Sequence, residues 1–397
     1  ETTAAQTQAQ EARAERTRIE AEAQGLQQES AVQARNLEDV IPMMGAVSLF
    51  AAGDKEGAML RLSDLIEANP VNTGLRIVRG ELYSQAEQPE NALADFEKAL
   101  ELEPGNPIAL LGKANAGNDT TEALALYDQI LQQDPEDTAA LMNRGNRLAQ
   151  RGQIIQAIES YTTALRIQPE LGTANLKEAL NGLITSQYSA AAAPTLQLES
   201  QSTLGTKQTG EIQGANASNV RNFKFSPQEL ETLEAAVNLL QDQDPEDVEG
   251  VMYRGVILMA REEEEASLEQ LNRAIALQPQ FPEAYIVRGV LYRHREDPVQ
   301  AQADFEKAVA QYTKVIAQTS EDAELYAARG VAYHHLGEVI KDYTQAIEDY
   351  TQALNLNPTY ATAYYFRGID RYSQGDLDAA IADYDQAIAL NPQFAEA

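Results

Sequence analysis

Apolar residues recur along much of this chain at the spacing of one face of an α-helix. The stretch AYYFRGIDRYSQGDLDAAIADYDQAIALNP, which ends at Pro392, contains the series Ala-Ile-x-x-Tyr-x-x-Ala-Ile, whose apolar positions are three and four residues apart. A short polar segment with a glycine divides the stretch, and a proline ends it. The pattern predicts two short amphipathic helices joined by a turn.

The same pair of helices recurs along the chain. Prolines that end successive units lie 34 residues apart in four cases, which are Pro70 and Pro104, Pro135 and Pro169, Pro245 and Pro279, and Pro358 and Pro392. A period of this length is typical of solenoid proteins, in which each unit buries its apolar face against its neighbours. We count nine units. Two are longer, because Gly289 and Gly330 are 41 residues apart and Gly330 and Gly368 are 38 apart, which predicts helices lengthened by about two turns and one turn.

The units resemble the tetratricopeptide repeat. That family places a bulky residue, a glycine, an alanine, an aromatic residue and a second alanine at fixed positions, and the last unit holds Tyr364, Gly368, Ala380, Tyr384 and Ala387 there. Arg371 departs from the pattern, where an aromatic residue is expected. The resemblance implies an all-α, right-handed superhelical solenoid of about nine helix-turn-helix repeats, with a non-enzymatic role in protein–protein interaction.

An arginine directly precedes the patterned glycine position in six units. A residue type repeated at one structural position indicates a packing or ion-pair role, because catalysis needs a single site. These residues are Arg79, Arg144, Arg254, Arg288, Arg329 and Arg367.

Four segments are expected along the chain. Residues 1–38 are rich in Ala, Gln and Glu and form a helix or a tail, 39–187 form the first repeat block, 188–225 a polar insert or linker, and 226–397 the second block. The insert either separates the two helices of one repeat or acts as a flexible linker, and alternation at its ends also allows a small β-hairpin. The apolar run Ile41–Ala52 is interpreted as a buried helix.

Composition narrows the function. The chain has 61 acidic and 30 basic residues and a formal charge of -31, which disfavours binding to nucleic acids and anionic membranes. The absence of Cys excludes disulfides, thiolate nucleophiles and Cys-based metal sites. No segment reaches the roughly 18 apolar residues of a membrane span, so no membrane insertion is expected. The first residue is Glu rather than Met, which leads us to expect an exported or extracellular protein, with a cytoplasmic protein as the alternative.

No catalytic or cofactor-binding motif is evident, so neither an enzyme nor a cofactor is predicted. Only three histidines are present. His334 and His335 suggest a metal site or a pH switch. His294 occupies the position of His335 one repeat earlier, and we hypothesise a weak divalent-metal site between these two, although no metal site is part of the main prediction.

The resemblance also implies a concave groove that binds a protein segment. The residues at groove positions are mixed and aliphatic and lack the Lys and Asn pair with which some family members hold a terminal carboxylate, so a hydrophobic or cationic segment suits them better. The candidates are Met252, Val256, Met259, Ile286, Val290, Arg293, His294, Val331, His334, His335, Tyr365, Ile369 and Tyr372.

The last repeat is followed by no further helix, and its apolar face therefore needs a cover. We expect that face to contact the start of another copy, which gives a filament or a ring, and we expect a homo-oligomer. The candidate residues of this joint are Ile381, Tyr384, Ile388, Phe394, Ile19 and Leu26. The alternative is a monomeric or dimeric adaptor that binds a peptide segment of another protein in its groove.

Overall fold

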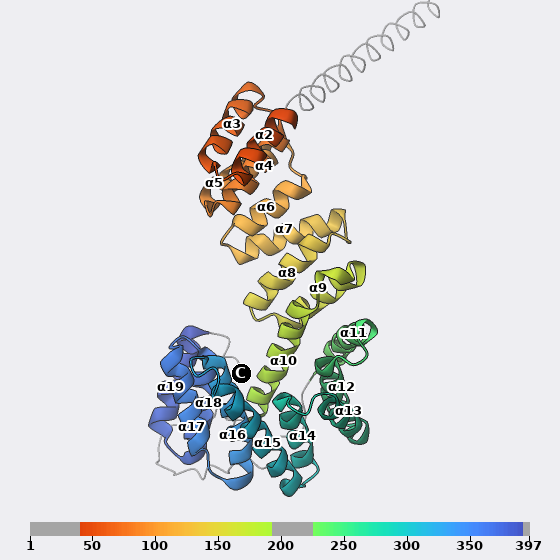
Figure 1. Ribbon diagram of the computed structural model, residues 1–397, viewed down its shortest axis with the longest axis vertical. Helices are drawn as coiled ribbons and strands as arrows, with labels where there is room; N and C mark the ends of the chain where they lie inside the picture. The colour runs from red at the N-terminus through yellow and green to blue at the C-terminus, as the bar shows by residue number, and fades with distance from the viewer. Residues whose placement is uncertain (1–39, 193–224, 392–397) are drawn as a thin grey trace, which may run out of the picture. The chain divides into compact units, whose positions relative to one another are not determined.

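A computed structural model describes residues 40–192 and 225–391 (Figure 1). These residues form eighteen α-helices and one short 3₁₀-helix, and no strand occurs among them. The all-α class expected from the sequence is therefore confirmed. The chain divides into two compact units, Glu1–Arg147 and Leu148–Ala397.

The first unit contains the helices at the start of the described chain. They are α2 (Val40–Ala51), α3 (Lys55–Ala68), α4 (Thr73–Gln85), α5 (Pro89–Leu102), α6 (Pro107–Ala116), α7 (Thr120–Gln133) and α8 (Thr138–Gln150), whose last residues belong to the second unit.

The second unit contains the remaining helices. They are α9 (Ile154–Ile167), the 3₁₀-helix η1 (Pro169–Leu171), α10 (Ala174–Ala192), α11 (Pro227–Gln243), α12 (Val248–Ala260), α13 (Glu264–Leu277), α14 (Pro282–His294), α15 (Pro298–Ile316), α16 (Ala323–Ile340), α17 (Thr344–Leu356), α18 (Ala361–Gln374) and α19 (Leu377–Leu390).

Helix ends follow the local signals in the sequence. Asn72 and Asn106 cap α4 and α6 by accepting backbone N–H bonds, and Ser226 forms a capping box with Glu229 at the start of α11. Pro282 begins α14, where its fixed φ suits the first helical turn. These signals divide the periodic sequence into helices of mostly 13 or 14 residues.

Most successive helices of the described ranges pack in pairs, and in most cases the second helix also contacts the first helix of the next pair. Thus α14 packs on α15, and α15 on α16. Small residues allow the close approach within a pair, since a Cβ atom added at Gly330 would lie 2.7 Å from Cε1 of Tyr350. Seven pairs pack in this way among the described helices, and they are α2–α3, α4–α5, α6–α7, α12–α13, α14–α15, α16–α17 and α18–α19. The count of nine repeats stays a prediction.

The two stretched repeats contain long helices, as the glycine spacing predicts. α15 has 19 residues and α16 has 18, compared with 13 in α12 and α14. The extra turns bring the end of α16 within reach of side chains on its neighbours, where the candidate site lies.

In the middle of the chain, a helix extends past a predicted segment boundary. α10 continues to Ala192, into the segment expected to be the polar insert, and the proposed hairpin lies outside the described residues. Further along, α11 packs against both α9 and α12. Residues 1–38, with Ile19 and Leu26, and Phe394 also lie outside the described residues. None of the helices in the described ranges is both long and apolar enough to span a bilayer.

Candidate functional site

The repeated arginines link neighbouring helices. Nε and Nη2 of Arg367 donate to the two carboxylate oxygens of Asp383 at 2.9 and 2.7 Å, and Nη1 donates to Oγ1 of Thr351 in the preceding repeat at 3.1 Å. Arg79, Arg288 and Arg329 make the same set of contacts. Their carboxylate partners are Asp95, Asp304 and Asp349, and their partners in the preceding repeat are Ser63, Asn272 and Thr313.

The other two arginines differ for a reason visible in the sequence. Arg144 pairs with Asp128 at 2.7 Å, and Arg254 donates to Asn238 at 2.5 Å, so both contact the preceding repeat. Within their own repeats, the position that holds Asp elsewhere holds Ser160 and Gln270. The predicted ion-pair role of the arginines is confirmed for Arg79, Arg144, Arg288, Arg329 and Arg367.

Most of the predicted groove residues are buried. They lie on α12, α14, α16 and α18, the first helices of four successive repeats. Nine of the thirteen have exposed fractions between 1% and 7%, and they are Met252, Val256, Met259, Ile286, Val290, His334, His335, Tyr365 and Ile369. The half-buried ones are Arg293, His294, Val331 and Tyr372. A partner could reach only this second set without displacing other side chains, and partner binding here stays a prediction.

The start of α10 covers part of α12. Nζ of Lys177 pairs with Glu249 at 2.8 Å and with Asp247, and the hydroxyl of Tyr253 donates to the backbone oxygen of Lys177 at 3.2 Å. These contacts join α10 to the start of α12.

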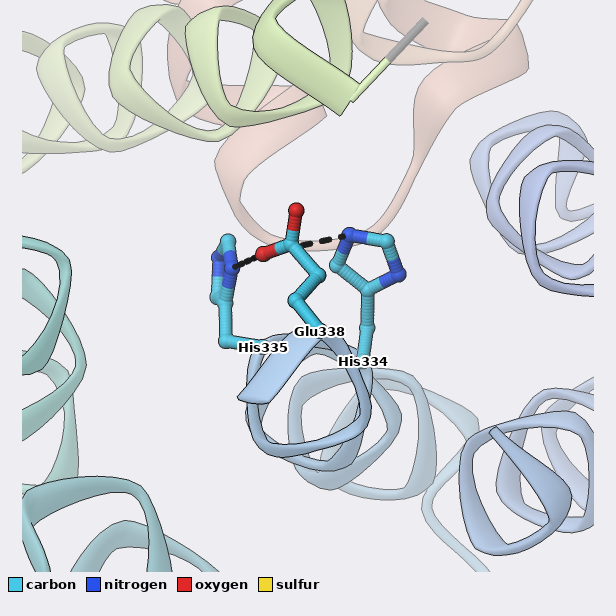
Figure 2. A group of neighbouring side chains, drawn as sticks. All are labelled: His334, His335 and Glu338. Carbon is cyan, nitrogen blue, oxygen red and sulfur yellow. Dashed lines mark hydrogen bonds and ion pairs between the residues drawn. The ribbon is translucent and has the colours of Figure 1, made fainter. Parts of the chain in front are cut away.

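Two histidines and a glutamate converge on α16 (Figure 2). Nδ1 of His335 lies 2.9 Å from Oε2 of Glu338, and Nε2 of His334 lies 4.0 Å from the same oxygen. Their spacing explains this arrangement, because residues three and four apart share one face of a helix. One ligand atom from each of the three side chains lies within 4.8 Å of the others, and this is the one such group among the described residues.

Residues from neighbouring helices complete the cluster. Nδ1 of His334 lies 2.5 Å from Oδ1 of Asp370 on α18, and Arg293 on α14 forms an ion pair with Glu338. Phe305 on α15 stacks on His335 with ring centroids 5.5 Å apart. The histidines are 2% exposed, so the cluster is nearly closed to water.

Burial governs the charge of this cluster. Burial lowers the pKa of His335 well below its ordinary value, and the positive charge of Arg293 acts in the same direction. Burial raises the pKa of the Asp370 carboxyl, although the contact with His334 opposes that change. His335 is therefore a neutral imidazole at pH 7.

Only part of this cluster is expected from the sequence. The predicted pairing joined His335 to His294, whereas the converging group contains His334 and Glu338 with His335. The spacing His-His-x-x-Glu is visible in the sequence and would have indicated three side chains on one helix face. The contact with Asp370, 36 residues away, carries no local signal.

The last described helix exposes apolar side chains. Ile381 is 58% exposed and Ile388 is 37% exposed, and Leu377 and Leu390 are 48% and 40% exposed. Tyr384, by contrast, is half-buried. The face proposed for assembly is thus open to solvent at its two isoleucines.

The first described helix also exposes apolar residues, which corrects an expectation. Ile41 is 81%, Met44 62% and Val47 41% exposed, and the buried residue of α2 is Ala46. The run Ile41–Ala52 is therefore not a buried helix. It packs by one face on α3, and Ile41, Met44 and Val47 lie three residues apart on a stripe that α3 leaves open.

Comparisons with known proteins agree with the repeat pattern. Family profiles described as "Tetratricopeptide repeat" match residues 75–106, 116–171, 299–339 and 361–394, and one described as "TPR repeat" matches residues 341–369. Tetratricopeptide repeat protein 16 of Homo sapiens is 24% identical over 147 residues, which are 33% of this chain and 17% of that protein. The DnaJ homolog subfamily C member 7 homolog of Schizosaccharomyces pombe is 28% identical over 117 residues, which are 30% of this chain and 21% of that protein. The chain therefore spans about a fifth of the length of these curated relatives.

Solved structures with similar chains include a tetratricopeptide repeat protein from Parabacteroides merdae ATCC 43184. It is 16% identical, with a TM-score of 0.36 over 85% of this chain and 99% of that one. Yeast Tom70 is 18% identical, with a TM-score of 0.32 over 81% of this chain and 69% of that one.

Proposed function

This chain belongs to the tetratricopeptide repeat family, whose members are generally scaffolds for protein–protein interaction, and on that premise we propose that it is a structural subunit that assembles head to tail with copies of itself. The joint would bring α19 of one copy against α2 of the next. The assembly involves no catalytic step.

The observation that carries this proposal is the exposure of apolar stripes on the first and last described helices. Solenoid repeats bury such stripes against the next repeat. Inside the chain, the second helix of a pair packs on the first helix of the next in several places, as α3 does on α4 and α17 on α18. A contact between α19 and α2 of another copy would repeat that arrangement.

The proposed joint is heterologous, because the two surfaces are different. A heterologous contact leaves one free surface of each kind after every addition, and so produces a ring or an open filament. Ile41 is 81% exposed and Ile381 is 58% exposed. Each residue can therefore be substituted without disturbing a core.

The adaptor alternative has less support. Nine groove candidates are buried, so the groove offers a partner few of the side chains expected to bind it. Binding of a segment at the half-buried residues Arg293, His294, Val331 and Tyr372 remains the competing prediction.

The test uses two single variants of the full chain, Ile41→Glu and Ile381→Glu. Sedimentation velocity and negative-stain electron microscopy over a concentration series should show the unchanged protein growing into rings or filaments. Each variant alone should remain monomeric, because a buried charge at the joint opposes association. An equimolar mixture should give dimers and nothing larger, since each variant retains one intact surface.

The matched control is Val299→Glu, which places the same charge at an apolar residue that is 73% exposed on α15. This variant should assemble like the unchanged protein. A chain that stays monomeric at every concentration would exclude self-assembly, and dimers formed by one variant alone would show a symmetric contact instead of a head-to-tail joint.

A further inference from the structure

The buried cluster on α16 has the composition of a metal site, and we propose that His334, His335 and Glu338 bind one first-row transition-metal ion of the Zn²⁺ type. Two imidazole nitrogens and a carboxylate oxygen are ligands that Zn²⁺, Co²⁺ and Ni²⁺ accept in proteins. The three side chains converge on one face of the helix (Figure 2).

The distances are close to those of a tetrahedral site. Ligand atoms about 2.0–2.2 Å from a zinc ion lie about 3.4 Å from one another. Oε2 of Glu338 is 2.9 Å from Nδ1 of His335 and 4.0 Å from Nε2 of His334, so the two distances bracket that value. Rotation of the side chains, without movement of the helix, would equalise them.

Asp370 fixes the tautomer of His334. Because its carboxylate contacts Nδ1, that nitrogen carries the proton, and the lone pair of the ring is on Nε2. Metal-binding histidines commonly donate their second nitrogen to a carboxylate in this way. Nε2 of His334 is buried and has no hydrogen-bond partner among the described residues, so a ligand would satisfy an otherwise unpaired polar atom.

Two aromatic rings pack against the cluster. Phe305 and Phe366 line the cluster, with ring centroids 5.5 Å from His335 and 6.1 Å from His334. The side chains of Arg293 and Glu338 are each 19% exposed, so solvent reaches the cluster through these two residues.

Arg293 supplies the positive charge next to Glu338. Its guanidinium pairs with Glu338 and neutralises the carboxylate. A bound metal ion would take over this role, and the positive charge of Arg293 would oppose it. Metal binding should therefore compete with the ion pair between Arg293 and Glu338.

The experiment measures Co²⁺ binding to the full, untagged chain, in excess Mg²⁺ so that the many surface carboxylates are occupied by a hard cation. Visible d–d absorption of Co²⁺ reports nitrogen ligands in tetrahedral geometry, and Zn²⁺ should displace it. We expect one ion per chain. Glu338→Gln and His334→Gln should abolish the absorption, and Asp370→Asn should weaken binding by about 10–100-fold.

Two further variants separate this site from other sources of binding. His294→Gln changes the one histidine outside the cluster and should leave binding unchanged. Arg293→Gln should strengthen binding about tenfold, because it removes the competing charge.

The proposal would be overturned by the absence of a stoichiometric Co²⁺ spectrum in the unchanged protein. Equal loss in His294→Gln and His335→Gln would also overturn it. Circular dichroism of each variant identifies a loss that comes from unfolding, and Glu338→Gln, which changes a more exposed residue than either histidine, provides the test if the histidine variants do not fold.

Discussion

Single residues in this protein owe their roles to the charges and helices around them. The repeated arginines are an example, because four of them place a guanidinium between a carboxylate of their own repeat and a polar side chain of the preceding repeat. These four are Arg79, Arg288, Arg329 and Arg367. Asp349 is 6% exposed and depends on Arg329 for both of its carboxylate contacts, at 2.7 Å each. The arginine is therefore needed because the carboxylate is buried.

Arg329→Met should destabilise the protein by about 3 kcal/mol, since it leaves the buried carboxylate of Asp349 without its counter-charge. Urea denaturation followed by circular dichroism measures the change. Arg295→Met is the control, because its partner Glu265 has a side chain that is 80% exposed, and loss of an exposed pair costs less than about 1 kcal/mol. Equal losses in the two variants would contradict a special role for the buried pair.

Glu283 supplies a pH-dependent contribution to stability. The hydroxyl of Tyr312 donates to Oε1 of Glu283 at 2.8 Å, and burial raises the pKa of this carboxyl above its ordinary value of 4.5. The folded protein therefore holds this proton more tightly than the unfolded chain. The resulting stability is present below pH 4.5 and is lost as the pH rises through the folded-state pKa.

Glu283→Gln should be more stable than the unchanged protein at pH 7 and equally stable near pH 4, because a neutral amide oxygen still accepts the hydrogen bond. Each unit of pKa difference corresponds to about 1.4 kcal/mol. The measurement is the urea midpoint between pH 4 and pH 7.5. Glu321→Gln, at an exposed residue, corrects for the loss of one negative charge, and an equal gain there would exclude the burial effect.

At the scale of the helices, close contact within a pair depends on a glycine, which has no side chain to separate the two helices. Gly330, Gly289 and Gly368 lie against Tyr350, Phe305 and Tyr384, and a methyl group at any of them would be within 2.7 Å of a ring carbon. The glycine therefore fixes how closely the first helix of a repeat approaches the second.

Gly330→Ala should lower the free energy of unfolding by about 1–2 kcal/mol, since overpacking against Tyr350 outweighs the better helix propensity of alanine. Gly182→Ala on α10 is the matched control, because no atom of the described residues beyond its own turn of helix lies within 4 Å of the added Cβ. This second variant should gain up to about 1 kcal/mol. Thermal unfolding of both would show opposite signs, and a loss in both would mean that packing at Gly330 is not the cause.

The sequence predicted these helices well, because their signals are local. Apolar spacing, capping residues and the glycine-to-glycine distance placed the helix pairs and the two long helices α15 and α16. It failed at α2, where an apolar run suggested burial. Hydrophobicity alone does not show whether a second layer is present, and α2 has a described neighbour on one face only.

For the whole molecule, the formal charge of -31 opposes the proposed assembly. Association of the unchanged chain should therefore increase between low salt and physiological salt, where the Debye length falls from about 30 Å at 0.01 M to about 8 Å at 0.15 M. Sedimentation velocity at a fixed protein concentration measures this effect, and a decrease in mean mass over that range would count against an apolar joint. Export of the chain stays a prediction.

The sequence by itself determined the all-α repeat fold, the helix pairs and the ion-pair role of the arginines, because a 34-residue period places the same residue types at the same structural position. Only the tertiary structure decided that nine groove candidates are buried, that α2 exposes Ile41, and that Asp370 meets His334 across 36 residues. These properties depend on which helices cover which faces. That choice is made by contacts between distant segments, which leave no periodic signal in the chain.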